Sequence, residues 1–159
     1  MRRHDAYRRL LRRVDSWYGR VKRSHADKVP CTVGCRDCCL GLFDVTLADR
    51  DLLRAGLAGL EPAVRADIEA RAQAILDQLR QWFPRLGDTL EGLSEEEVDE
   101  VCDWVGQVEC PVLGKENECR LYDFRPLTCR LHGVPVIDRT GEPLHEEGCG
   151  KCRLTAEEA

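Results

Sequence analysis

The apolar positions of the chain follow a helical period in four segments. In the first, an apolar residue recurs every three or four positions, which predicts a helix over about residues 4–24. Its apolar stripe consists of Tyr7, Leu10, Leu11, Val14, Trp17, Tyr18 and Val21. Pro30 then ends the pattern, because proline lacks the amide hydrogen that a helix interior needs.

Local start and stop signals predict the second and third helices. Thr46 with Asp49 marks a helix start, and leucines at helical spacing follow as far as Leu60. Pro62 suits the first turn of the third helix, since its fixed φ is already helical. Pro84 then stops that helix.

A fourth helix is predicted to begin after Ser94, which forms a capping box with Glu97, and to end near Gly106. Cys102 falls on its apolar face, so we expect a small core residue there rather than a ligand. Beyond residue 107 glycine and proline become frequent and predict loops. Residues 134–144 suit a small β-hairpin that turns at 138–141.

Together these elements predict a mainly α fold, in which about four helices pack on a loop-rich, cysteine-clustered half with a small β-hairpin. A chain of 159 residues has the length of a single domain. Within it we expect a basic helix over residues 1–30, a metal-binding core over 31–133, and a hairpin with a Cys-x2-Cys tail over 134–159. The 43% hydrophobic and 33% charged content is that of a globular protein in water.

The charge of the chain is distributed unevenly. Residues 1–30 hold ten Lys or Arg against three Asp, a net charge of +7, while the whole chain carries −5. The remaining residues therefore carry −12. Either the basic helix lies against the acidic remainder, which we favour, or it binds an acidic protein partner. Nucleic acid is the poorer partner, because no motif of a known nucleic-acid reader accompanies the basic residues.

Nine of the ten cysteines fall into two groups with the spacing of metal ligands. The first group is Cys31, Cys35, Cys38 and Cys39, and the second is Cys110, Cys119, Cys129, Cys149 and Cys152. Thiolates two to four residues apart on a loop can all point at one centre. Such a loop binds a soft metal ion or an iron–sulfur cluster.

Disulfide bonds are the alternative use of so many cysteines. The sequence shows no export signal, and no apolar stretch approaches the ~20 residues that cross a bilayer. We therefore expect a cytoplasmic protein with no membrane partner, whose thiols stay reduced. Cys38 and Cys39 are adjacent, and a bridge between them would be strained. Metal binding is the better interpretation.

The order and spacing of these cysteines resemble the YkgJ-like cysteine-cluster family, described as zinc- or iron-chelating domains. The resemblance covers residues 31–133 and rests on the motifs at 31–39 and 110–130, the second including Arg125-Pro126 and Cys129-Arg130. It implies ligands drawn from Cys31, Cys35, Cys38, Cys39, Cys110, Cys119 and Cys129. Similar domains include a flagellin lysine methylase, which is an analogy of fold rather than evidence of methyl transfer.

The number of thiols exceeds the four that one zinc ion or one cubane cluster needs. Either two centres exist, or some cysteines only surround the ligands. Cys149 and Cys152 lie outside the shared motifs and suit a second centre, a redox pair or a structural role. Many thiols and few histidines place an iron–sulfur cluster slightly ahead of zinc.

Several neighbours of the cysteines are candidate cofactor-binding residues. The charges of Arg36, Arg125 and Arg130 would lower thiol pKa values and offset a thiolate centre. Pro126 is expected to open a short helical turn that places Cys129 near a helix N-terminus, which also favours thiolate. The remaining candidates are Tyr122, expected to be a packing residue, and His132 and His145 as extra ligands.

Three functions remain in view. The first is a metal-binding protein with a structural, redox or metal-handling role. The second is a cluster-dependent modifying enzyme, which predicts a pocket beside the cysteines lined by Tyr122 and Arg125. The third is an adaptor that binds an acidic partner through the basic first helix.

Overall fold

The computed structural model describes residues 2–41, 43, 45–87, 89–140, 142, 149–155 and 158. Its helices are α1 (Arg2–Ser24), α2 (Leu47–Ala58), α3 (Pro62–Trp82), α4 (Glu95–Val105) and α5 (Leu127–Leu131). Three short 3-10 helices are η1 (Asp37–Cys39), η2 (Leu90–Gly92) and η3 (Tyr122–Phe124). The predicted mainly α fold is confirmed: within the described ranges, β structure is limited to isolated bridges.

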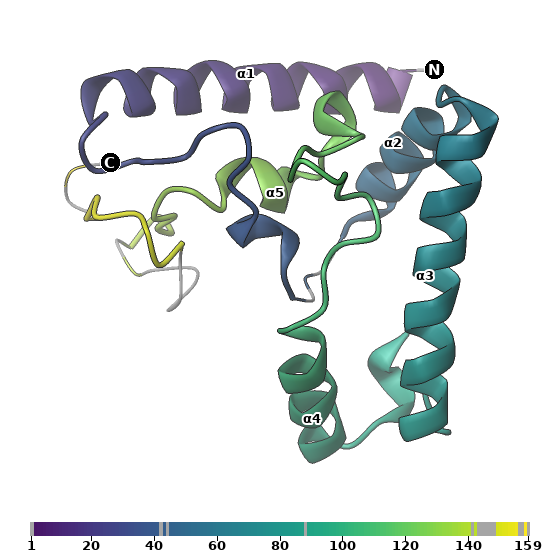
Figure 1. Cartoon of the computed structure of the whole chain (residues 1–159). Helices are drawn as coiled ribbons and strands as arrows, with labels where there is room; N and C mark the ends of the chain where they lie inside the picture. The colour runs from purple at the N-terminus through teal and green to yellow at the C-terminus, as the bar shows by residue number, and fades with distance from the viewer. Residues whose placement is uncertain are drawn as a thin grey trace.

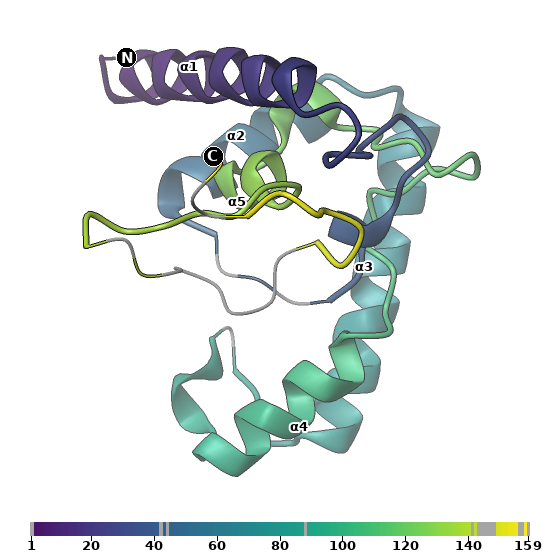
Figure 2. The same cartoon turned by 90° about the vertical axis from the view of Figure 1, so that its left-hand side faces the viewer.

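The helices frame the loops that carry the cysteines. Helix α1 crosses one end of the molecule, and α2 and α5 lie beneath it (Figure 1). Helix α3 runs away from that end, and α4 lies beside the far half of α3, as both views show (Figures 1 and 2). None of the described helices is both long and apolar enough for a membrane span.

The predicted helix starts are confirmed, because each depends on a local cap. The Thr46 side chain accepts a hydrogen bond from the Asp49 amide, and the Asp49 side chain accepts one from the Thr46 amide. Ser94 and Glu97 form the same reciprocal pair at the start of α4. Pro62 occupies the first turn of α3.

Eight of the buried apolar residues form two clusters of four. The first, called here the α1 cluster, consists of Val21, Val29, Val134 and Leu154. The second consists of Leu79, Phe83, Val101 and Val105, and joins α3 to α4. Only the α1 cluster includes cysteines among the side chains packed on it. Cys31 and Cys152 are therefore supported by the cluster to which α1 contributes Val21.

Asp49 links three helices near the cysteine loops. Its carboxylate is 2% exposed and accepts hydrogen bonds from the Tyr7 hydroxyl on α1, from Thr46, and from the Leu127 amide at 3.1 Å. Burial alone would raise the pKa of Asp49, but these hydrogen bonds outweigh burial and lower it. The buried charge thus fixes the start of α5, the helix that carries Cys129.

One expectation needs correction. Cys102 is exposed rather than part of the core, because one step along α4 turns it away from the buried line of Val101 and Val105.

The expectation that the basic stretch 1–30 lies against the acidic remainder stays a prediction. Lys28 pairs with Glu158 near the end of the chain. Four arginines of α1 are exposed and form no ion pair with any described residue: Arg8, Arg9, Arg12 and Arg13.

The predicted hairpin is described only in part. The Asp138 amide donates a hydrogen bond to the Glu142 carbonyl oxygen at 2.8 Å, which closes a turn at the predicted place. The returning arm falls on residues outside the described ranges.

Candidate metal centre

The two cysteine loops meet along a short stretch of paired backbone. The Cys110 amide donates to the Cys39 carbonyl oxygen at 2.7 Å, and the Gly41 amide donates to the Val108 carbonyl oxygen at 3.4 Å. Leu40 and Glu109 form an antiparallel bridge between them. Residues some 70 positions apart in the sequence are thereby brought side by side.

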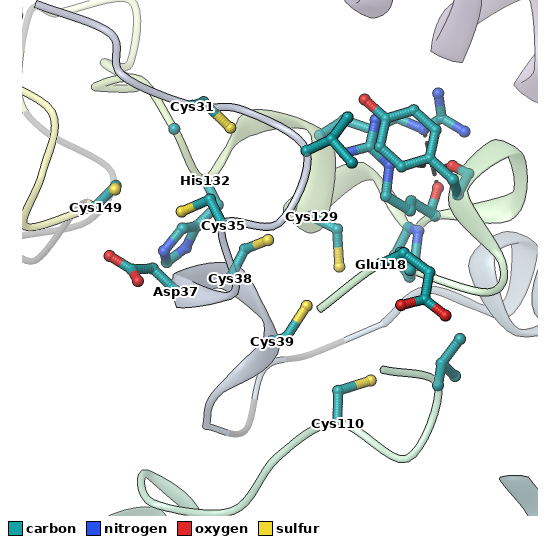
Figure 3. Close-up of a pocket in the computed structure, with 18 of the residues that line it drawn as sticks. Cys31, Cys35, Asp37, Cys38, Cys39, Cys110, Glu118, Cys129, His132 and Cys149 are labelled. Carbon is teal, nitrogen blue, oxygen red and sulfur yellow. Dashed lines mark hydrogen bonds between the residues drawn. The ribbon is translucent and has the colours of Figure 1, made fainter. Parts of the chain in front are cut away.

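A cavity of about 910 Å³ opens where the loops meet (Figure 3). Eight of the nine candidate ligands line it: Cys31, Cys35, Cys38, Cys39, Cys110, Cys119, Cys129 and Cys149. The described cysteines are all free thiols, so the disulfide alternative finds no support in this structure.

Five thiols, called here the inner thiol group, act on one another's ionisation: Cys38, Cys39, Cys110, Cys119 and Cys129. Cys38 and Cys39 share a side-chain hydrogen bond, which lowers the pKa of Cys38 to about 6 and raises that of Cys39. Burial comes first in raising the pKa of Cys110, Cys119 and Cys129, and neighbouring thiolates add to it.

The prediction that Cys129 is a favoured thiolate is wrong for the metal-free chain. Pro126 does precede the short helix α5, with Cys129 inside it. However, burial and then the charges of Cys38, Cys110 and Cys119 raise the pKa of Cys129 to about 12. Burial and the neighbouring thiolates therefore set the direction of the shift at Cys129, although it lies in the first turns of α5.

Arg125 is a cation that acts on three thiols of the inner group, Cys38, Cys119 and Cys129. The hydrogen bond from Cys39 does most to lower the pKa of Cys38, and the charge of Arg125 lowers it further. The same charge opposes the increase in pKa that burial causes at Cys119 and Cys129. The guanidinium of Arg125 lies 3.7 Å from the centre of the Tyr122 ring, and its Nε donates to the Tyr122 carbonyl oxygen at 3.0 Å.

Tyr122 lies at the rim of the cavity rather than in the core. Its side chain was expected to pack, but the residue is 56% exposed. Tyr122 and Arg125 both line the cavity, as the enzyme hypothesis predicted for a pocket beside the cysteines.

The other two candidate arginines have other partners. Arg36 pairs with Glu109 and is not among the residues that line the cavity. Arg130 is buried and pairs with Asp15 on α1. Its guanidinium also donates to the Arg125 carbonyl oxygen at 2.9 Å, so Arg130 supports the backbone that presents Arg125.

The four remaining candidate cysteines, called here the outer thiol group, are Cys31, Cys35, Cys149 and Cys152. Cys31 and Cys152 pack on the α1 cluster. Cys35 accepts a hydrogen bond from the Lys151 ammonium at 3.8 Å. In Figure 3, Cys31, Cys35 and Cys149 lie on one side of Cys38, with Cys39, Cys110 and Cys129 on the other.

Of the two candidate histidines, only His132 belongs to the described residues. His132 lines the cavity, and Figure 3 shows its ring beside Asp37 and Cys35. His145 lies outside the described residues, as do Glu146 and Glu147.

Three contributors to the site were not predicted. Tyr18 lines the cavity from α1, although its spacing only indicated an apolar stripe. Arg71 reaches from α3 to the Leu113 carbonyl oxygen at 2.6 Å and opposes the effect of burial on Cys110. Lys151 binds Asp37 at 2.7 Å, and its place between Cys149 and Cys152 was the one available signal.

The donor chemistry of the cavity fits zinc or iron. Thiolate sulfur is the ligand that these metals share in closed protein sites. As the side chains stand, no three His, Cys, Asp or Glu residues in the described part of the chain are arranged to hold an ion.

Fold and site together define a helical metal-chelating domain built on two cysteine loops. The chain belongs to the CxxCxxCC family, whose model is described as "Putative zinc- or iron-chelating domain" and matches residues 30–146. No curated protein and no solved structure matches the chain. The family match includes the inner thiol group and ends before Cys149 and Cys152.

Proposed function

We propose that the inner thiol group chelates one metal centre and that this centre is an iron–sulfur cluster rather than a zinc ion. The observation that carries the proposal is the gathering of five thiols, from three separate segments of the chain, around one cavity with Arg125. The family description supports metal chelation in general and covers both metals.

The donor set supports iron. All five residues offer sulfur, and clusters bound by cysteine alone are the usual form of biological iron–sulfur centres. Four of the five thiols suffice for a cubane cluster, which leaves one thiol as a neighbour of the ligands.

Metal would also serve as a fold-stabilising link. The inner thiols belong to η1, to the segment 110–119 and to α5, which lie far apart in the sequence. Because ordering such loops costs conformational entropy, the free energy of metal binding contributes directly to folding. We therefore expect removal of the metal to lower the free energy of unfolding.

The test is to purify the protein without oxygen and measure iron, zinc and acid-labile sulfide per chain, together with the visible absorption spectrum. We expect iron and sulfide in equal amounts and a coloured protein. Colourless protein that carries zinc would overturn the choice of iron, and protein without either metal would overturn chelation itself.

A matched pair of variants shows whether the inner thiols are the ligands. The double variant Cys110→Ser/Cys119→Ser should lose the iron and sulfide, since it leaves only three of the five inner thiols that line the cavity. Cys102→Ser should keep both, because Cys102 is exposed on α4. Equal metal content in the two variants would contradict the assignment.

The size of the cavity favours a second candidate function, a cluster-dependent modifying enzyme. Its volume falls in the range of small-molecule sites, about 300–1,000 Å³, and Tyr122 and Arg125 line it. The methylase-like form of this candidate predicts that metal-loaded protein binds S-adenosylmethionine in a calorimetric titration. Tyr122→Ala should weaken that binding without loss of metal. Absence of binding by the loaded protein would count against the methylase-like form.

A further inference from the structure

Cys31, Cys35 and Cys149 of the outer thiol group lie on the other side of Cys38 from Cys39, Cys110 and Cys129 (Figure 3), and the outer group has the composition of a closed metal site. We propose that Cys31, Cys35, Cys149 and Cys152 form a second centre, which binds one Zn²⁺ ion through four thiolates. This site goes beyond the proposed function, because two of its ligands lie outside the family match. Evidence against this second centre would leave the proposal for the inner centre unchanged.

Each half of the proposed site is a tight turn that presents two thiols. The Cys152 amide donates to the Cys149 carbonyl oxygen at 2.9 Å. In the first loop the Cys35 amide donates to the Thr32 carbonyl oxygen at 3.1 Å, and Gly34 allows the turn with its φ of 90°. Two cysteine pairs separated by two to four residues, each on a turn, are the usual composition of a structural zinc site.

The tail is fastened against the first cysteine loop. Lys151 donates to the Asp37 carboxylate at 2.7 Å and to the Cys35 sulfur at 3.8 Å. The Arg153 amide donates to the Lys28 carbonyl oxygen at 2.8 Å. Leu154 is 6% exposed and belongs to the α1 cluster. These contacts bring Cys149 and Cys152 next to residues more than 110 positions earlier, so the juxtaposition is built into the fold.

Two of the four thiols share one apolar floor. Cys31 and Cys152 both pack against the α1 cluster, which lies beneath the end of α1. Such a floor excludes water from one side of the site and so strengthens the attraction between thiolates and a cation.

The buried hydroxyl of Tyr18, beside the outer thiol group, is a separate observation that supports a charged ligand there. This hydroxyl oxygen has no hydrogen-bond partner of normal geometry among the described residues. Tyr18 packs on the α1 cluster together with Cys31 and Cys152, and it lines the same cavity as Cys149. A buried unpaired hydroxyl costs roughly 1–3 kcal/mol. A metal-bound thiolate is the acceptor that would remove this cost.

Nearby cations would offset the charge of the loaded site. Four thiolates around Zn²⁺ leave a net charge of −2. Lys151 lies beside Cys35, and Lys22 donates from α1 to the Cys31 carbonyl oxygen. Positive charges at this distance stabilise a thiolate-rich centre.

The first experiment counts zinc. The reduced full-length protein is stripped of metal and reloaded without oxygen, with Zn²⁺ as the only metal, so that both thiol groups take zinc. We expect two equivalents per chain. The double variant Cys149→Ser/Cys152→Ser should retain one equivalent, and Cys110→Ser/Cys119→Ser should also retain one. The control Cys102→Ser should retain two.

The variants separate this proposal from the proposed function. If the tail variant binds as much zinc as the natural chain, the second centre is refuted while the inner centre stands. If only the 110/119 variant keeps its full zinc, the inner centre is refuted and the second centre stands.

A second measurement does not depend on how the variants fold. The natural chain, with and without zinc, is treated with iodoacetamide, and the labelled cysteines are identified by mass spectrometry. We expect zinc to protect Cys149 and Cys152 at least tenfold. Equal labelling with and without zinc, or a disulfide between these two residues in the reduced and loaded protein, would overturn the proposal.

Discussion

Gly56→Ala is the substitution that tests most directly how helix α2 positions the metal-binding loops. Gly56 is buried near the end of α2, where a helical glycine costs about 1 kcal/mol relative to alanine. A Cβ atom built there would lie 2.6 Å from the Cγ of Phe124 and 3.0 Å from the Cδ2 of Leu121. The glycine therefore permits a close approach between α2 and η3.

Two opposing contributions determine how much Gly56→Ala changes the free energy of unfolding. Carbon atoms in contact lie about 3.5–4.0 Å apart, so the Phe124 ring would have to move by roughly 1 Å. Overpacking of this kind costs about 1–3 kcal/mol, and the helix propensity of alanine returns about 1 kcal/mol. We expect a net loss of about 1 kcal/mol in the free energy of unfolding. Because η3 lies between Cys119 and Arg125, metal affinity should fall as well.

The assay is urea unfolding of the metal-free and metal-loaded protein, with Gly59→Ala as the matched control. Gly59 caps the same helix with a φ of −88°, and a Cβ there would meet only the Gly56 carbonyl oxygen, at 3.5 Å, and that of Ala55. This control should be neutral or slightly stabilising. If Gly56→Ala is as stable as the natural chain, the close approach of α2 to η3 is not a constraint and the reasoning fails.

Three further predictions concern charge. Burial alone would raise the pKa of Asp49, but the hydrogen bonds to its carboxylate lower that pKa in the folded protein. The contribution of Asp49 to the free energy of unfolding is therefore complete above about pH 4 and is lost as the pH falls through the lower folded pKa. Acid unfolding followed by circular dichroism should show a weaker pH dependence for Asp49→Asn. In metal-free protein between pH 5 and 7, iodoacetamide should label Cys38 faster than Cys129. The pKa of Cys38 is lowered to about 6, whereas that of Cys129 is raised to about 12. Equal rates would contradict the hydrogen bond between Cys38 and Cys39. If α1 binds an acidic partner, the natural chain should bind a polyglutamate peptide in a salt-sensitive way, which fluorescence anisotropy can measure. Replacement of four exposed arginines by serine should abolish this binding without loss of metal: Arg8, Arg9, Arg12 and Arg13.

The helices were predictable because their signals are local. A capping box needs only residues three positions apart, as at Ser94 and Glu97, and a proline at the first turn needs no partner at all. The sequence also contained Asp49 as a cap for α2. It did not show that the same carboxylate binds the Leu127 amide, since that contact spans 78 residues.

Burial around single residues was harder to predict, because the direction of a helix face depends on what packs against it. Cys102 fitted an apolar stripe in α4, yet the contact with α3 uses Val101 and Val105. Tyr18 fitted the stripe of α1, yet its hydroxyl reaches the cysteines. In both cases hydrophobic spacing located the helix correctly and left the role of the side chain open.

The division of the thiols into two groups shows most clearly what spacing cannot resolve. Two residues separate Cys35 from Cys38, which is the spacing of an ordinary chelating pair. Contacts from distant segments separate them: Lys151 binds Asp37 and Cys35 from the tail, whereas the Cys110 amide binds the Cys39 carbonyl oxygen from the second loop. Because both sets of contacts act on η1, the pair is divided between two neighbourhoods. A motif defined by spacing alone is thus consistent with one centre or two, and the tertiary contacts are the basis on which we propose two.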